Sequence, residues 1–316
     1  MADKNATERL STNAAGIARA AEILRDGGLV AVPTETVYGL AARADSDRAV
    51  AKIYAAKGRP SFNPLIVHVA SVTQAKELAD FSAEAESVAA RMWPGALTLV
   101  LPVKSDAALA SAITAGLPTL ALRMPDHPAM RDLIEMTGCP LAAPSANRSN
   151  AISPTTADHV LETLDGRIDA VIDGGKCQKG LESSILAIRH DGRWEELRPG
   201  PVDLDALRRS VSDGEVVDAA MGAIEAPGQQ IRHYSPGKPL RLNAAVPEED
   251  EFMIGYGNIS GDIALSDRGD LGEAAMRLYS TLHAAAKSDR PRIAVAPIPE
   301  QGIGKAINDR LRRAAA

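Results

Sequence analysis

The chain has 316 residues, of which 45% are apolar, 24% are charged and 3% are aromatic, and its formal net charge is −6. These values are typical of a soluble globular protein and exclude a disordered chain, and the negative charge excludes a nucleic-acid coat protein, although a local basic cleft stays compatible with it. The length predicts two domains, each with its own core.

The first two thirds of the chain predict helices and strands in alternation. The predicted helices cover residues 13–25, 46–54 and 127–136, with another starting at 73, and the predicted strands cover 29–32, 65–69, 96–101, 119–123, 141–143, 170–173 and 184–188. Such alternation indicates an α/β sheet whose faces are covered by helices.

Residues 212–239 break this rhythm, because they are rich in glycine and proline and carry a polar cluster at 229–234. The stretch is longer than a passive connection needs, which hints at a functional loop. Beyond it, strands at 240–243, 252–254, 263–265 and 292–296 and helices at 271–286 and 303–315 predict a small α/β domain. We therefore expect domains over 1–211 and 238–316, joined by a linker over 212–237.

The two cysteines, Cys139 and Cys177, provide neither the spacing of a zinc site nor a disulfide framework, which is typical of a reducing cytoplasm. The first residues lack the apolar core of a signal peptide, and no stretch approaches the roughly 18 apolar residues that span a bilayer. We expect a cytoplasmic protein that has no membrane partner.

A positively charged turn at residues 57–69 is the strongest local signal. Lys57, Arg59 and Asn63 lie on a loop held by glycine and proline, immediately before a predicted strand, and such a loop favours an anionic ligand. The alternative is that both cations only neutralise a helix end. Polar turns at 33–40 and 143–147 also follow strand-like runs, and such turns meet where α/β sheets bind ligands.

Several further residues allow both a structural and a functional interpretation. His68 lies in an apolar strand and is typical of a core histidine, whereas Arg123 ends a strand, where its guanidinium suits a carboxylate ligand. Ser145 and Ser153 are equally compatible with turns, and Glu182 with a loop. The sequence contains no P-loop and no nucleophile elbow.

Taken together, the motifs resemble those of the threonylcarbamoyl-AMP synthases, the YrdC-like family, in its longer two-domain form. The matching segments are 33–40, 57–60, 63–68, 93–101, 123–128, 143–147, 153–155, 173–175, 180–183, 197–200, 227–228, 233–236 and 304–311. One departure is Ser184, where threonine is expected.

The resemblance implies a YrdC-like catalytic domain, a twisted open sheet with helices around a concave cavity, and a small C-terminal Rossmann-like α/β domain, with the linker acting as a lid. It implies a nucleotidyltransferase that joins L-threonine, bicarbonate or CO₂, and ATP into threonylcarbamoyl-adenylate and pyrophosphate. Mg²⁺ would enter with ATP, and a downstream transferase complex would pass the group to the adenosine beside the tRNA anticodon, giving t6A.

The resemblance also assigns site residues. Those expected around ATP are Arg59, Asn63, Thr119, Ala143, Ser145, Ser153, Arg198 and Tyr234, and those expected around threonine are Thr36, His68, Arg123 and Ser183. Lys57 and Arg59 would provide the catalytic positive charge, and the metal ligands stay unassigned. Two alternatives are a carbamoyl transferase of hydrogenase maturation, whose cysteine-rich zinc fingers are missing here, and a non-catalytic RNA-binding module with a basic cavity.

Overall fold

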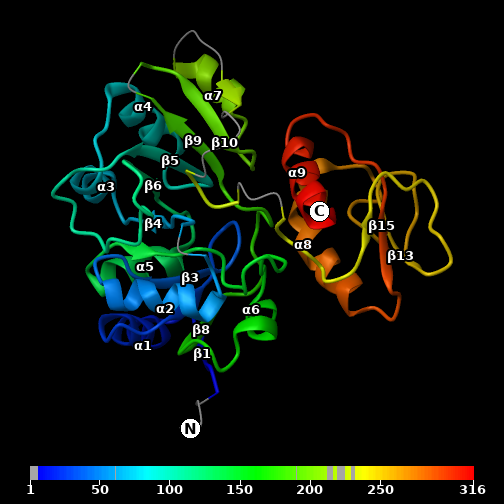
Figure 1. Cartoon of the computed structure of the whole chain (residues 1–316), viewed down its shortest axis with the longest axis horizontal. Helices are drawn as coiled ribbons and strands as arrows, with labels where there is room; N and C mark the ends of the chain where they lie inside the picture. The colour runs from blue at the N-terminus through cyan, green and yellow to red at the C-terminus, as the bar shows by residue number, and fades with distance from the viewer. Residues whose placement is uncertain (1–5, 61, 190, 212–215, 219–224, 229–231) are drawn as a thin grey trace.

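The computed structural model describes residues 6–60, 62–189, 191–211, 216–218, 225–228 and 232–316, and these form a larger and a smaller α/β unit side by side (Figure 1). The strands of the larger unit run in the order β1 (Glu8–Ser11), β8 (Ala170–Asp173), β2 (Val30–Val32), β3 (Gly39–Arg43), β7 (Leu141–Ala142), β4 (Ile66–His68), β6 (Thr119–Arg123), β5 (Leu97–Pro102), β9 (Ser184–Ile188), β10 (Trp194–Arg198) and β11 (Val216–Asp218). Parallel and antiparallel neighbours are mixed in this sheet.

Helices cover both faces of the larger sheet, and the alternation of side chains along each strand decides which face a residue reaches. On β2, for example, Val30 and Val32 share a core with α1 (Ala14–Arg25) and α5 (Pro128–Thr137). Ala31 between them faces the opposite core, which contains residues of α2 (Asp47–Lys57), α3 (Val72–Leu78), α4 (Ala83–Met92), α6 (Ala157–Leu164) and α7 (Leu204–Val211).

On the face that carries Val30 and Val32, the half of the sheet formed by β4, β6, β5 and β9 is covered differently. Its apolar residues there, such as Ile66 and Ala121, pack against Leu197 and Ala226 and not against a helix of the described chain. His68 and Arg123 lie two positions further along β4 and β6, on this same face. Because β4 and β6 are parallel and pair His68 with Arg123, both side chains reach the same end of the sheet.

The smaller unit is a parallel sheet in the order β12 (Leu240–Arg241), β15 (Arg292–Val295), β13 (Glu251–Gly255) and β14 (Ile263–Ala264). Its helices α8 (Leu271–Lys287) and α9 (Gly304–Ala315) lie on the side toward the larger unit (Figure 1). Val37 and Leu181 of the larger unit belong to the same apolar cluster as residues of α8 and α9. None of the helices in the described ranges combines the length and the apolar composition that crossing a bilayer requires.

The structure confirms the predicted α/β class with a large twisted sheet and a smaller parallel one, and it adds elements that the sequence did not predict. Residues 39–43 form β3 where we expected a turn to run through residue 40. β11 lies inside the predicted linker and pairs in parallel with β10. Gln229 and Gln230 of the predicted lid lie outside the described residues.

Candidate active site

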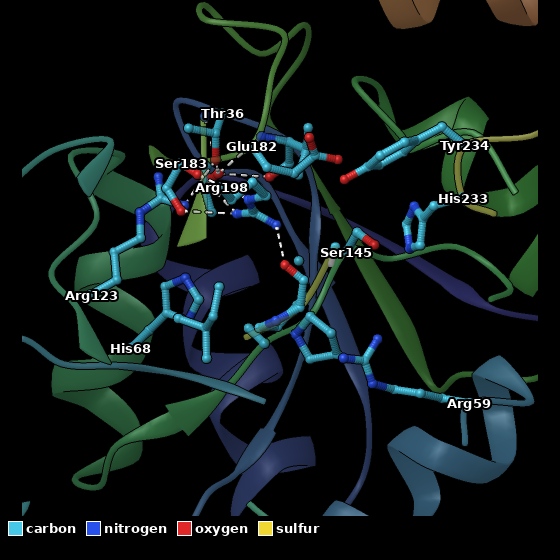
Figure 2. A pocket seen from close by; sticks show the side chains of 18 residues that line it. Thr36, Arg59, His68, Arg123, Ser145, Glu182, Ser183, Arg198, His233 and Tyr234 are labelled. Atoms are coloured by element: carbon cyan, nitrogen blue, oxygen red, sulfur yellow. Dashed lines mark hydrogen bonds between the residues drawn. The ribbon is translucent and has the colours of Figure 1, made fainter. Parts of the chain in front are cut away.

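A buried cavity lies over the partly covered face of the larger sheet (Figure 2). Its volume is about 40 Å³, which is room for about three water molecules at about 10–15 Å³ each. Arg123 and His68 lie on one side of it, Arg59, His233 and Tyr234 on the other, with Ser145 between them (Figure 2).

The three polar turns that the sequence singled out each contribute to this cavity. Thr36 comes from the turn before β3, Arg59 from the loop after α2, and Ser145 from the turn after β7. The Ser145 hydroxyl donates to Asn147 Oδ1 at 2.6 Å, which fixes that turn. Ala143 lines the cavity beside it. Residues that are far apart in the sequence therefore meet at one site.

Arg123 is held in the cavity wall by an acidic partner. Its Nη2 donates to Glu35 Oε1 at 2.6 Å, its Nη1 to Thr36 Oγ1 at 2.9 Å and its Nε to the Gly95 carbonyl at 3.2 Å. Both members of the ion pair are 5% exposed. A guanidinium carries five N–H donors, so these three contacts leave two N–H groups to meet a ligand.

The other oxygen of Glu35 is held as well. Glu35 Oε2 accepts the backbone N–H of Asp126 at 3.2 Å. Thr34 Oγ1 accepts the N–H groups of Thr36 and Val37 at 3.1 and 3.2 Å, so the turn that carries Glu35 is closed by its own side chain. This turn therefore delivers one carboxylate to a fixed position beside Arg123.

Arg198 connects the sheet to the predicted linker. Its Nε and Nη2 donate to the Ser183 carbonyl at 3.1 and 3.0 Å, and its Nη1 donates to the Pro227 carbonyl at 3.1 Å. The hydroxyl of Ser183 lies 2.7 Å from that of Thr98. Burial lowers the pKa of Arg198, although a guanidinium stays charged near neutral pH.

Arg59 forms the opposite wall of the cavity. Its Nη2 donates to Asn63 Oδ1 at 2.6 Å and to the Pro64 carbonyl at 2.9 Å. Burial lowers the pKa of Arg59 to about 10, so it is cationic near neutral pH. Among the described residues, neither Arg59 nor Arg198 forms a salt bridge, although the Glu182 carboxylate also lines the cavity and interacts with the charge of Arg198.

Lys57 does not line the cavity, unlike its neighbour Arg59. Its Nζ donates to the carbonyls of Ser145 and Asn147, at 2.6 Å each, and lies 3.4 Å from Asn147 Oδ1. Burial and the charge of Arg59 lower the pKa of Lys57, whereas three oxygen acceptors favour the protonated amine. The ammonium of Lys57 is thus engaged by the 145–147 turn, and its catalytic role stays a prediction.

Three residues expected beside ATP also lie outside the cavity lining. The Asn63 side chain holds Arg59, and the Ser153 hydroxyl donates to Glu182 Oε1 at 2.5 Å. Thr119 lies at the start of β6, four residues before Arg123, and its buried Oγ1 has no partner among the described residues. Asn63 and Ser153 thus contact residues of the wall.

Two histidines face the cavity with a nitrogen that has no partner in the described part of the chain. These are His68 Nδ1 and His233 Nδ1, both buried. Burial lowers the pKa of each histidine to about 3, and the nearby charge of Arg123 contributes to the shift of His68. Both rings are therefore neutral near pH 7, and buried polar atoms of this kind are suited to a ligand.

Tyr234 reaches the cavity from the end of the predicted linker. Its backbone φ is 63°, a left-handed conformation that costs a tyrosine about 1–2 kcal/mol. The ring packs 5.5 Å from Tyr279 of α8, and the Arg310 guanidinium of α9 lies 5.5 Å from it. The N–H of His233 donates to the Arg313 carbonyl at 3.1 Å. The smaller unit thus holds this segment against the cavity.

Glu182 joins the two units at the cavity wall. Its Oε2 accepts from Arg310 Nε at 3.0 Å and from the Tyr279 hydroxyl at 2.8 Å. Burial by itself would raise the pKa of Glu182, but the charges of Arg310 and Arg198 and two hydrogen bonds lower it to about 2. Glu182 is therefore an ionised carboxylate whose oxygens are already engaged.

Sequence patterns predicted no role for Glu35 or for the pair formed by Glu182 and Arg310. The sequence separations are 88 residues for Arg123 and Glu35 and 128 for Arg310 and Glu182, so no local pattern reveals either pair. The only sequence signal for these residues was their position inside segments that match the family's motifs.

Few of the described side chains that line the cavity could bind a metal ion directly. Of the described residues that line it, Glu182 is the single carboxylate, and its partners are Ser153, Tyr279 and Arg310. Mg²⁺ commonly binds nucleotide phosphates and water with few protein ligands. This arrangement fits a metal ion that arrives with a polyphosphate.

Comparison with known proteins covers nearly the whole chain. A family model described as “Telomere recombination” matches residues 22–200, and one described as “Threonylcarbamoyl-AMP synthase, C-terminal domain” matches residues 202–316. The chain is 41% identical to the threonylcarbamoyl-AMP synthase of Bacillus subtilis, over 98% of this chain and 95% of that relative.

Solved structures agree with these matches. The chain resembles the P. abyssi protein Sua5 complexed with L-threonine, with a TM-score of 0.88 and 36% identity over 98% of this chain and 97% of that one. E. coli YciO, at 18% identity, has a TM-score of 0.55 over 63% of this chain, which is a likeness of fold alone.

Proposed function

The chain belongs to the threonylcarbamoyl-AMP synthase family, and we propose that it joins L-threonine, bicarbonate or CO₂, and ATP into threonylcarbamoyl-adenylate and pyrophosphate. It is an enzyme, a synthase that transfers an AMP group. Similarity to a synthase along the full length of both chains favours this function over a hydrogenase-maturation transferase or an RNA-binding module.

The observation that carries the proposal is the distribution of charge in the cavity. Arg123 is paired with Glu35 and keeps two free N–H groups, whereas Arg59 and Arg198 have neutral partners among the described residues. An arginine in a salt bridge suits one carboxylate, and two arginines outside any salt bridge suit a triphosphate. We assign the Arg123 side, with Thr36, His68 and Ser183, to threonine, and the Arg59 side, with Ala143, Ser145, Arg198 and Tyr234, to ATP.

The chemistry needs two bonds to form. The neutral threonine amine adds to carbon dioxide and releases a proton, which gives a carbamate. A carbamate oxygen then attacks the α-phosphorus of ATP, and the bond from that phosphorus to the bridging oxygen breaks as pyrophosphate leaves. Positioning and charge compensation carry most of such a phosphoryl-type step. Mg²⁺ bound to ATP would neutralise the leaving pyrophosphate, and Arg59 would compensate the remaining charge.

We propose that residues 226–228 and 232–237 act as part of a lid. A free carbamate decomposes in water, so the site must be dry during the reaction. Pro227, Gly228, His233 and Tyr234 already line the cavity, which supports this role. Lys57, Asn63 and Ser153 would act indirectly, by holding the 145–147 turn, Arg59 and Glu182.

We further propose that the enzyme works in the cytoplasm and supplies a transferase complex that modifies tRNA to t6A. Thr119 stays in our assignment as a residue near ATP, although it lies outside the cavity lining. Its unpartnered hydroxyl is the reason to keep it.

Pyrophosphate release tests the assignment of Arg59. With all three substrates present, Arg59→Ala is expected to lower kcat by about 100–1,000-fold, the usual cost of losing one charge-stabilising contact. Arg268→Ala, at an arginine whose side chain is 84% exposed, is the control and should keep normal activity. Normal pyrophosphate release by Arg59→Ala would contradict the phosphate assignment.

A further inference from the structure

His159, Glu162 and His283 form a second polar cluster, away from the cavity, where α6 of the larger unit meets α8 of the smaller one. Each offers one potential ligand atom, and these atoms all lie within 4.8 Å of one another. The two imidazole rings are stacked, with centroids 3.8 Å apart and an angle of 9° between the planes. None of the three residues lines the cavity described above.

Both ring nitrogens of His283 lie beside an oxygen that only accepts. Nε2 lies 3.3 Å from the Ser153 carbonyl, and Nδ1 lies 3.1 Å from Glu162 Oε2. A neutral ring can donate to only one of these oxygens. When Nε2 donates to Ser153, Nδ1 presents a lone pair toward Glu162, and a cation between these two atoms would stabilise that tautomer.

His159 is held in a similar way from its other side. Its Nδ1 accepts the Thr155 backbone N–H at 3.4 Å and lies 3.3 Å from Thr155 Oγ1. For Nε2 to bind a metal ion, the ring hydrogen would have to lie on Nδ1 and be donated to this hydroxyl, in place of the backbone contact. Metal-binding histidines nearly always donate their second N–H to a protein acceptor, and Ser153 and Thr155 provide such acceptors here.

One of the three separations between ligand atoms fits a common ion. Ligand atoms about 2.1 Å from one zinc ion, at angles between square and tetrahedral, lie about 3.0–3.4 Å apart, and the 3.1 Å separation of His283 Nδ1 and Glu162 Oε2 falls in this range. Lys287 Nζ occupies the other oxygen, Glu162 Oε1, at 2.5 Å, from a side chain that is 63% exposed. Because the two ring planes are nearly parallel and 3.8 Å apart, the rings would have to tilt toward each other so that both in-plane lone pairs point to one ion.

We propose that His159, Glu162 and His283 bind one divalent transition-metal ion of the zinc type. Two imidazoles and a carboxylate suit zinc, cobalt or nickel and not magnesium. Water would complete the coordination. Because the ligands come from α6 and α8, the ion would connect the two units independently of the Glu182–Arg310 pair.

Cobalt and zinc titrations of the full-length, tag-free, chelator-treated chain test this site. We expect one equivalent of Co²⁺ to give a visible absorption band, and Zn²⁺ at about 100 times Kd to raise Tm by about 5 °C. Glu162→Gln and His283→Ala should each weaken zinc binding by at least about 100-fold, more than loss of an outer contact costs.

His127→Asn is the matched control, because asparagine keeps the cap that His127 provides to α5. It should bind both metals like the parent chain. The proposal is wrong if the parent chain gives no cobalt band, since the contact between His283 and Glu162 is then an ordinary hydrogen bond from Nδ1–H. It is also wrong if a band of equal strength survives in Glu162→Gln and in a folded His283→Ala variant.

Discussion

Glu35 and Arg123 set the position of the charge that we assign to the threonine carboxylate. The pair is buried and joined at 2.6 Å, and Thr36 and Gly95 hold the guanidinium from two other directions. Breaking one side of a buried pair typically costs about 3–5 kcal/mol, because the remaining charge loses its partner. Glu35 therefore acts as a positioning residue for Arg123.

Replacing this carboxylate tests its role. Glu35→Gln should raise KM for threonine by at least about tenfold, which corresponds to about 1.4 kcal/mol, with a smaller change in KM for ATP. Pyrophosphate release at varied threonine and varied ATP measures both constants. Glu22→Gln, at an exposed carboxylate, is the control. Equal changes in both KM values would contradict a specific role on the threonine side.

Glu182 makes stability depend on acid pH. Because its pKa in the folded state, about 2, is below the ordinary glutamate value, its ionised form stabilises the folded state above about pH 4.5, and this contribution is lost as the pH falls toward 2. Thermal unfolding between pH 7 and pH 3 should therefore show a shallower acid decline for Glu182→Gln than for the parent chain. Parallel declines would show that Glu182 does not titrate with folding.

At the scale of elements, the predicted alternation of helices and strands explains most of the larger sheet, because long amphipathic helices such as α1 carry clear periodicity and caps. The sequence did not predict β1, β3, β10 or β11. Of these, β3 follows a polar turn, and β11 lies in a segment whose composition is typical of a linker. We keep the proposed limits of 1–211, 212–237 and 238–316, with β11 as a linker strand added to the larger sheet.

The sequence also predicted that the three polar turns would meet, and each contributes to one cavity, but it did not distinguish Lys57 from Arg59. Charge, glycine and proline mark a rigid cationic loop, and they do not show which of two neighbouring cations turns inward. Lys57 ends α2 and points at the 145–147 turn, whereas Arg59 follows Gly58, whose φ of 60° reverses the chain. That distinction depends on backbone geometry.

Gly228 tests the lid. Its φ is 89°, and a Cβ there would lie 3.0 Å from Arg198 Cδ and 3.1 Å from the Tyr234 hydroxyl. Gly228→Ala should lower kcat/KM for ATP at least about tenfold, the equivalent of about 1.4 kcal/mol. Gly237→Ala is matched, because its φ is 73° and a Cβ added there would have no atom within 4 Å. Equal activity of the two variants would argue against a lid.

At the scale of the whole molecule, the two units meet through an apolar cluster and through Glu182. Gly180 lets the larger unit approach α8 closely, because a Cβ there would lie 2.5 Å from Met276 Cα and 2.7 Å from the Ala275 carbonyl oxygen. The helices α8 and α9 lie on this contact side of the smaller unit (Figure 1). The smaller unit thereby supports Tyr234 at the cavity.

Gly180→Ala should therefore weaken the contact between the units and lower the free energy of unfolding. We expect about 1–3 kcal/mol of overpacking in addition to a backbone cost of about 1 kcal/mol, measured as the change in urea unfolding. Gly175→Ala has a similar φ of 76° and no atom within 4 Å of the added carbon, so it should show the backbone cost alone. Equal losses of unfolding free energy in the two variants would mean that α8 shifts to accommodate the added carbon at no further cost.

Our central proposal is that this cavity joins threonine, carbon dioxide and ATP in one product. Mass spectrometry of the purified chain incubated with L-threonine, ¹³C-bicarbonate and ATP tests it most directly. We expect threonylcarbamoyl-adenylate that carries one ¹³C atom and disappears when any one substrate is omitted. Hydrolysis of ATP without this adduct, or an adduct that forms without threonine, would contradict the proposal.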